Sequence, residues 1–491
     1  MKKTLLGLAI LLGSVSVTLG QKKKIEKRFD RAEAEAHITY LASDELKGRD
    51  PARPEMKLAI DYIAGEFEKY GIKTVPGADG YFQNIPFVLS SPPKSGSLKL
   101  GESTFNQKES MLVLDGTSVT GDFELVDLGY GLAEDYKGKD VKGKIVVTNL
   151  GAPDRMSPAQ LFAVGREKVA LASENGAAGI IEMYNIPSIP WQLIANYLSS
   201  DQMSLDQGAA SKLPYIWVKD LQNDTKNAVA KGEIKSVSLN IQGKTQKPID
   251  GKNILGWVEG TDKNLKSEFV MLSAHYDHVG VGTPDASGDS IYNGARDNAI
   301  GTVSVINAAK YFAKNPPKRS ILFALWTAEE KGLLGSAYYA ENPLLPLEQM
   351  VYNLNIDGAG YNDTSVITVI GLTRTTEMAT LEKATEAFGL KAIEDPAPEQ
   401  GLFDRSDNVS FAKKGIPAPT FSLGFTSFDD EINKYYHKAA DEVDSIDMDY
   451  AVKYWKAYIY AAEMIADNKS KPFWLPNDKY EAVGKSLYGL E

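Results

Sequence analysis

The chain has 491 residues, of which 43% are hydrophobic and 24% are charged, and its formal net charge is −11 at pH 7. This length leaves room for two or three domains with hydrophobic cores, and the acidic balance argues against a nucleic-acid-binding protein. The chain contains no cysteine. That absence excludes disulfides, thiolate metal sites and a lipid anchor attached through cysteine.

Residues 1–20, MKKTLLGLAILLGSVSVTLG, have the pattern of a secretory signal peptide. Two lysines precede an apolar run to about Leu12, and small residues follow it. The apolar run is too short to span a bilayer, and no later segment has 18 uninterrupted apolar residues. We therefore expect cleavage near Gly20 and a mature protein that is secreted or periplasmic, without a stable membrane anchor. A retained anchor is the alternative.

Two different patterns follow the signal peptide. Residues 21–120 begin with two helical patterns and continue with short strands punctuated by Gly and Pro, and we assign them to the first part of a larger domain. Residues 121–245 alternate strand and helix patterns, as in DVKGKIVVTNLG and LPYIWV. This alternation indicates a separate small α/β module inserted in the larger domain, without a ligand cluster or candidate nucleophile of its own.

Residues 246–470 contain apolar strand patterns that alternate with helical patterns. The strand patterns are NILGWVEG, EFVMLSAHYD, RSILFALWTAEE and MVYNLNIDGAG. They predict the main part of an α/β domain with a mixed, mostly parallel sheet sandwiched by helices. Functional residues of such sheets gather at the carboxyl ends of the strands. Residues 471–491 form a C-terminal tail, either packed on the domain or partly extended.

Polar side chains follow these strands at their carboxyl ends. Imidazoles and carboxylates without thiolates suit zinc, although manganese or cobalt would tolerate the same ligands. A single His or Asp at the end of a strand is usually a turn residue or a residue whose hydrogen bonds are satisfied locally. The recurrence of such residues on successive elements instead favours one shared metal site. The candidates are His275, Asp277, Asp297 at the start of a helix, the adjacent Glu329 and Glu330, Asp357, and, later in the chain, His437.

Residue alternation in an extended chain places neighbours of His275 on opposite sides. Asp277 lies two residues further on, and we expect its carboxylate to accept the second ring N–H of His275. We expect His278 to project to the other side and not to be a ligand. The adjacent carboxylates of Glu329 and Glu330 repel each other unless a cation or a shared proton offsets the repulsion.

Five motifs together resemble the zinc-dependent aminopeptidases of peptidase family M28: HYDHVG, NGARDNAIGT, TAEEKGLLGS, NLNIDGAG and YYHKAADEVDSID. The segment LASDELKGRD resembles the N-terminal signature of the same family, and residues 142–182 resemble a protease-associated (PA) domain. The resemblance implies a zinc-exopeptidase fold of the phosphorylase/hydrolase-like type with a PA-like domain inserted.

The resemblance also implies a role for each matched residue. The implied enzyme is a secreted exopeptidase, with an aminopeptidase as the first choice. It would cleave N-terminal peptide bonds of peptides or proteins through a hydroxide shared by two Zn²⁺ ions. A cis peptide bond is implied after the bridging aspartate, between Asp297 and Asn298. The implied ligands are Asp297 bridging both ions, His275 and Asp357 at one ion, and Glu330 and His437 at the other, with Glu329 as general base and Asp277 supporting a ligand.

Some features depart from the family, and other functions stay open. FDRSDNVSF has Asn408 where the family often has His, and Phe403 where some members have an aromatic hydroxyl, which leaves the substrate pocket in question.

One alternative is a glutaminyl-cyclase-like transferase. Another is a carboxypeptidase-like enzyme in which Arg405 binds a substrate carboxylate. A catalytically inactive binding protein, similar to the transferrin receptor ectodomain, is the third.

Overall fold

The computed structural model describes residues 20–154, 156–206, 208, 212–358 and 360–490. The chain forms two compact units, and the second is inserted into the first. Unit 1 comprises residues 1–85 and 250–491, and unit 2 comprises residues 86–249. The predicted signal peptide lies, except for Gly20, outside the described residues. No helix in the described part of the chain is both long enough and apolar enough to cross a bilayer.

Unit 1 is built on a mixed sheet, and its fold confirms the predicted α/β class. Its strand order is β18-β17-β19-β16-β12-β15-β11-β1. The central strands β15, β12, β16 and β19 are parallel, whereas β11 pairs antiparallel with β15, and β17 antiparallel with β19. The strands are β1 (Phe82–Ser91), β11 (Thr245–Val258), β12 (Phe269–His275), β15 (Ser320–Trp326), β16 (Met350–Ile356), β17 (Val366–Ile370), β18 (Lys391–Ile393) and β19 (Thr420–Ser422).

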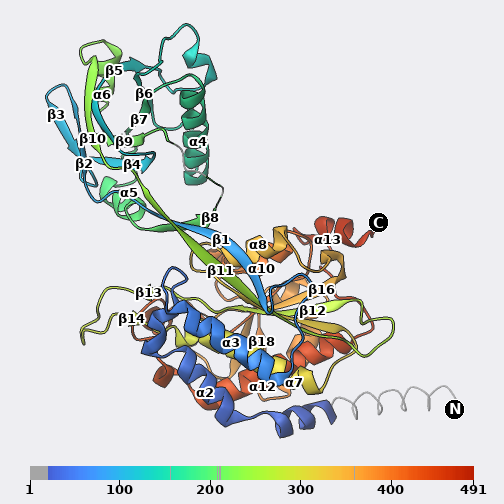
Figure 1. The fold of residues 1–491 in the computed structure, drawn as a ribbon. Coiled ribbons are helices and arrows are strands. Elements are labelled where there is room, and N and C mark those ends of the chain that lie inside the picture. The colour runs from blue at the N-terminus through green and yellow to red at the C-terminus, as the bar shows by residue number, and fades with distance from the viewer. Residues whose placement is uncertain (1–19, 155, 207, 209–211, 359, 491) are drawn as a thin grey trace, which may run out of the picture. The chain divides into compact units, whose positions relative to one another are not determined.

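Helices cover both faces of this sheet (Figure 1). Every residue of β12 is buried: Val270 and Leu272 face one apolar core, and Phe269 and Met271 face the other. Burial on both faces explains the continuous apolar runs that predicted parallel strands. The first core holds α2 (Arg31–Leu41), α3 (Met56–Tyr70), α7 (Ile300–Lys314), α9 (Met378–Glu386) and α12 (Met448–Asp467), and the second holds α8 (Leu334–Glu341) and α10 (Asn408–Ala412).

Shorter elements connect the strands and helices of unit 1. They include the two-stranded ribbon of β13 and β14 and several 3₁₀ turns. Their bounds are η1 (Asp44–Arg49), β13 (Gly280–Val281), β14 (Ile291–Tyr292), the π-helical turn η3 (Ala295–Ala299), η4 (Leu347–Gln349), η5 (Leu372–Arg374), η6 (Pro398–Gln400), η7 (Leu402–Asp404), α11 (Asp430–Tyr435), η8 (Val443–Ser445) and α13 (Glu481–Tyr488).

Unit 2 is a separate α/β unit, and it begins earlier than the predicted boundary at residue 121. The strands before that boundary belong to unit 2 because β2 and β5 both pair antiparallel with β10, and Leu98 and Leu100 share a core with Val237. The predicted likeness to a PA domain stays a prediction. The elements are β2 (Gly96–Leu100), β3 (Ser103–Asn106), β4 (Met111–Asp115), β5 (Val119–Asp127), η2 (Ala133–Tyr136), β6 (Ile145–Asn149), α4 (Pro158–Glu174), β7 (Gly179–Tyr184), α5 (Trp191–Leu198), β8 (Gln202–Leu205), β9 (Tyr215–Lys219), α6 (Asp224–Ala230) and β10 (Ser236–Ile241).

The C-terminal tail packs on unit 1, which is the first of the two predicted alternatives. Trp474 is 2% exposed in the second core, and its ring N–H donates to the carbonyl of Gly415 at 2.8 Å. Arg374 stacks on the same ring, 5.4 Å from its centroid, and forms an ion pair with Asp478. The tail is therefore part of the folded domain.

We expect Trp474→Ala to lower the free energy of unfolding by about 3–5 kcal/mol, because it removes a large buried ring and leaves the Gly415 carbonyl without its donor. Leu475→Ala is the matched control, since Leu475 is 37% exposed. Denaturant unfolding monitored by circular dichroism compares the two variants. Equal, small losses would show that the tail does not support the core.

Candidate metal centre

The sheet of unit 1 gathers the predicted metal ligands at one edge. Strand β12 lies between β15 and β16, and all three run parallel, so their carboxyl ends meet. Two further residues approach from turns on the same side. His275 ends β12, Glu329 and Glu330 follow β15, Asp357 follows β16, Asp297 lies in η3, and His437 comes two residues after α11.

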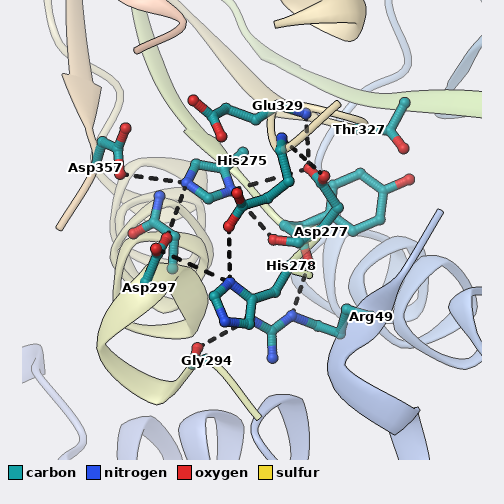
Figure 2. A network of polar contacts seen from close by, with 12 residues as sticks. Arg49, His275, Asp277, His278, Gly294, Asp297, Thr327, Glu329 and Asp357 are labelled. Carbon is teal, nitrogen blue, oxygen red and sulfur yellow. Dashed lines mark hydrogen bonds and ion pairs between the residues drawn. The ribbon is translucent and has the colours of Figure 1, made fainter. Parts of the chain in front are cut away.

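One group of ligand atoms forms around His275. Its Nε2 lies 3.3 Å from Asp357 Oδ1 and 3.4 Å from Asp297 Oδ1 (Figure 2). The other nitrogen of the His275 ring is fixed, because Nδ1 lies 3.1 Å from the main-chain carbonyl oxygen of Asp277. The backbone is held too, because the Thr302 hydroxyl donates to the His275 carbonyl at 2.9 Å. His275 is thus fixed with one nitrogen free toward the two carboxylates.

A second group forms around the other oxygen of Asp297. His437 Nε2 lies 3.3 Å from Asp297 Oδ2 and 3.1 Å from Glu330 Oε2. Asp297 therefore directs one carboxylate oxygen to each group, which is the geometry that a bridging ligand needs. The peptide bond between Asp297 and Asn298 is cis, which confirms the geometry implied by the family resemblance.

His278 points into the second group, so the expectation that it projects away is wrong. Its Nδ1 lies 2.9 Å from Glu330 Oε1 and 4.0 Å from Asp297 Oδ2. The prediction assumed alternation along an extended chain, but β12 ends at His275. Beyond that point the backbone is redirected, with the His278 N–H bonded to the Arg49 carbonyl at 3.2 Å.

Asp277 has a different partner from the one predicted. Its carboxylate accepts the backbone N–H groups of Glu329 at 3.1 Å and of Glu330 at 3.3 Å, and stands 3.9 Å from the His275 ring nitrogen. Only its main-chain carbonyl contacts that ring. Asp277 therefore fixes the loop that carries both glutamates, and burial raises its pKa to about 6.

Two residues that the sequence did not single out bind the main chain around the ligands. Asp441 accepts the backbone N–H of Arg296 at 2.8 Å and of Asp297 at 3.1 Å, which positions the shared carboxylate. Arg49 is buried and donates to four main-chain carbonyls, those of Leu41, Tyr276, Asn293 and Gly294. The only sequence signal for them was their place inside two of the family-like motifs, LASDELKGRD and YYHKAADEVDSID.

Gly294 is required where it stands. Its φ is 59°, and a Cβ there would lie 2.2 Å from the Asp297 carbonyl oxygen and 2.6 Å from the His278 ring. Both contacts are closer than side-chain carbons tolerate, so a larger residue would displace the shared aspartate or His278.

The site carries concentrated negative charge. Burial opposes the charged imidazolium, but the carboxylates of Asp297 and Glu330 outweigh it and raise the pKa of His437 to about 10. Burial and the neighbouring carboxylates of Asp357 and Asp407 raise the pKa of Glu329 well above its ordinary value, although His275 opposes this shift. The protein thus offers a field that favours positive charge between the two groups.

This donor set fits divalent cations. The ligand atoms of His275, Asp297 and Asp357 lie within 4.8 Å of one another, and so do those of His278, Asp297, Glu330 and His437. Imidazole nitrogens and carboxylate oxygens are ligands that zinc accepts, and the two buried groups have the negative charge to receive it.

A third group, of Glu33, His37 and Glu66, is less suited to a metal. Both ring nitrogens of His37 already face tyrosine hydroxyls, those of Tyr62 at 2.7 Å and Tyr70 at 3.1 Å. Glu33 is also paired with lysines.

A pocket opens onto the two ligand groups. Its space, including the mouth, is about 650 Å³. The metal-site residues that line it are Asp297, Glu329, Glu330, Asp357 and His437. The other lining residues include several hydrophobic side chains and the cation Arg405. The hydrophobic residues are Ile370, Leu402, Phe425, Phe428 and Ile432.

With this geometry in place, comparison with known proteins identifies the domain. Residues 253–462 match peptidase family M28. This region of unit 1 is an M28 peptidase domain. The matched range includes His275, Asp297, Glu330, Asp357 and His437, so every predicted ligand falls inside the M28 region.

The curated relatives of this chain are partial matches. Aminopeptidase YwaD of Bacillus subtilis is 25% identical over 328 residues, which are 66% of this chain and 62% of that protein. The vacuolar membrane protease of Pyricularia oryzae is 41% identical over 93 residues, 18% of this chain and 8% of that protein. The chain thus spans less than two thirds of the length of either relative.

A solved structure shares the fold. The aminopeptidase from Aneurinibacillus sp. strain AM-1 matches with a TM-score of 0.57, covering 93% of this chain and 98% of that chain at 20% identity. At this identity the likeness shows the fold alone.

We expect Asp277→Ala to weaken metal binding about 10- to 100-fold, because it frees the loop that carries Glu329 and Glu330 without removing a ligand atom. Asp285→Ala is the control, since Asp285 lies in an exposed loop and bonds only within it. Titration of the metal-free protein with Zn²⁺ measures the affinity of both variants. Wild-type affinity in the Asp277 variant would contradict this role.

Proposed function

We propose that the protein is a metal-dependent aminopeptidase that acts outside the cytoplasm. The observation that carries this proposal is the pair of ligand groups that share Asp297, with Glu329 beside them on a pocket. His275 and Asp357 would hold one divalent ion, Glu330 and His437 the other, and His278 would hold Glu330 in place. The M28 match and the predicted signal peptide support the same conclusion.

Bound divalent ions would polarise the substrate carbonyl and make a water molecule acidic enough to attack it at neutral pH. Glu329 would take the proton of the attacking water and deliver it to the leaving amine. In the protein without metal, burial raises the pKa of Glu329 well above its ordinary value, and bound cations would oppose that shift. The backbone N–H of Glu329 donates to the Asp277 carboxylate, which fixes the main chain that carries the Glu329 side chain.

The pocket suggests how substrate would lie. Its hydrophobic wall of Ile370, Leu402, Phe425, Phe428 and Ile432 would receive an apolar side chain of the first substrate residue. One of the carboxylates that line the pocket would bind the free α-amino group. Arg405, which lines the same pocket, would instead face a carboxylate if the enzyme were carboxypeptidase-like.

A panel of substrates tests the reaction class. We expect hydrolysis of aminoacyl-nitroanilides with apolar side chains, no hydrolysis of the same compounds with a blocked amine, and loss of activity on chelation that Zn²⁺ restores. Release of ammonia from an N-terminal Gln peptide, without hydrolysis of the nitroanilides, would favour a glutaminyl cyclase. Full activity after exhaustive metal removal would overturn the proposal.

A second prediction separates the two adjacent glutamates. Glu329→Gln should lower kcat by about 10²- to 10⁴-fold with metal content unchanged, because it removes only proton transfer. Glu330→Gln should lower metal content as well as rate, because it weakens a ligand. Elemental analysis alongside steady-state kinetics distinguishes them. If both variants lose metal equally, Glu329 is not the general base.

A further inference from the structure

Unit 1 has a second pocket that the proposed reaction does not use. Residues 20–28 are helical, and with α7 and α12 they enclose a space of about 570 Å³, including its mouth. The pocket is lined by Ile25, Arg28, Phe29, Asp30, Asn307, Lys310, Tyr311, Lys314, Asn315 and Ile459, none of which lines the catalytic pocket.

Helix α7 presents a polar stripe to this pocket. Asn307 and Tyr311 lie one turn apart on one face of a helix that is otherwise largely apolar, and Asn315 follows directly after the helix ends at Lys314. Two members of the stripe have partners: the Tyr311 hydroxyl donates to Glu463 at 3.1 Å, and the Asn315 amide donates to the Tyr311 carbonyl at 2.7 Å.

Asn307 is the exception in the stripe. It is 7% exposed, yet its side-chain N–H₂ has no hydrogen-bond partner among the residues that the structure describes. A buried donor without a partner is destabilising by about 1–3 kcal/mol. An acceptor supplied by a ligand in this pocket would remove that penalty.

The charges of the pocket favour an anion. Three of its four charged residues are basic, in a chain whose net charge is −11. Lys310 is paired with Glu33 and Asp30. Arg28 and Lys314 form no ion pair with any residue that the structure describes. Both cations are therefore available to a ligand.

We propose that this pocket binds a small organic anion, with its negative group held by Arg28 and Lys314 and its apolar part against Ile25, Phe29 and Ile459. The Asn307 amide would donate to the same ligand. This binding is separate from the catalytic reaction, so it holds whether or not the chain is an aminopeptidase.

Isothermal titration of the full-length mature protein with hexanoate tests the proposal. We expect saturable binding, at least fivefold weaker binding in Arg28→Gln, Lys314→Gln and Asn307→Ala, and no binding of the uncharged analogue hexanamide. Inorganic phosphate, which has the charge without the apolar chain, should bind more weakly than hexanoate. Equal affinity for hexanamide, or for phosphate, would overturn the assigned chemistry.

Two control variants show where the anion binds. Lys27→Gln removes an exposed cation from the same helical segment but outside the pocket lining, and should leave the affinity unchanged. Arg405→Gln removes the cation of the catalytic pocket and should also leave it unchanged. Loss of binding in Arg405→Gln, with wild-type affinity in Arg28→Gln and Lys314→Gln, would place the anion in the catalytic pocket and refute the proposal.

Discussion

The constraint on which the site depends is the burial of several carboxylates in one small space. Asp297, Glu330 and Asp357 converge on three imidazoles, and Glu329 stands beside them. Such charges repel one another and lose hydration on burial, so the fold must hold them against their own electrostatics. The raised pKa of Glu329 and the raised pKa of His437, to about 10, are the visible effects of that crowding.

The fold meets this constraint with backbone groups. Asp277 accepts backbone N–H groups of the loop after β15, and Asp441 accepts those of η3, so these two ligand-bearing turns are each tied to a carboxylate that is not itself a predicted ligand. The ligands are therefore positioned by the main chain, and the pocket wall is free to be hydrophobic.

The sequence was sufficient to predict the parts of the site that follow from strand order. His275, Glu330 and Asp357 could be grouped because parallel strands align their carboxyl ends, and a buried parallel strand has a recognisable apolar run. The orientation of His278 could not be predicted, because alternation holds only while the chain is extended and β12 stops at His275. The start of unit 2 was missed because β2 pairs with β10, which lies far along the sequence.

Arg49 shows what the contacts behind the ligands achieve. Its guanidinium lies near Asp441, Asp297 and Asp277, whose charges oppose the effect of burial, yet burial prevails and lowers its pKa to about 10. All its described hydrogen bonds go to main-chain carbonyls, and it forms no ion pair with a ligand among the described residues. A salt bridge to a ligand carboxylate would have to break when a cation binds. A cation bonded only to carbonyls reduces the repulsion at the site and keeps all its own bonds whether the ligands hold metal or not.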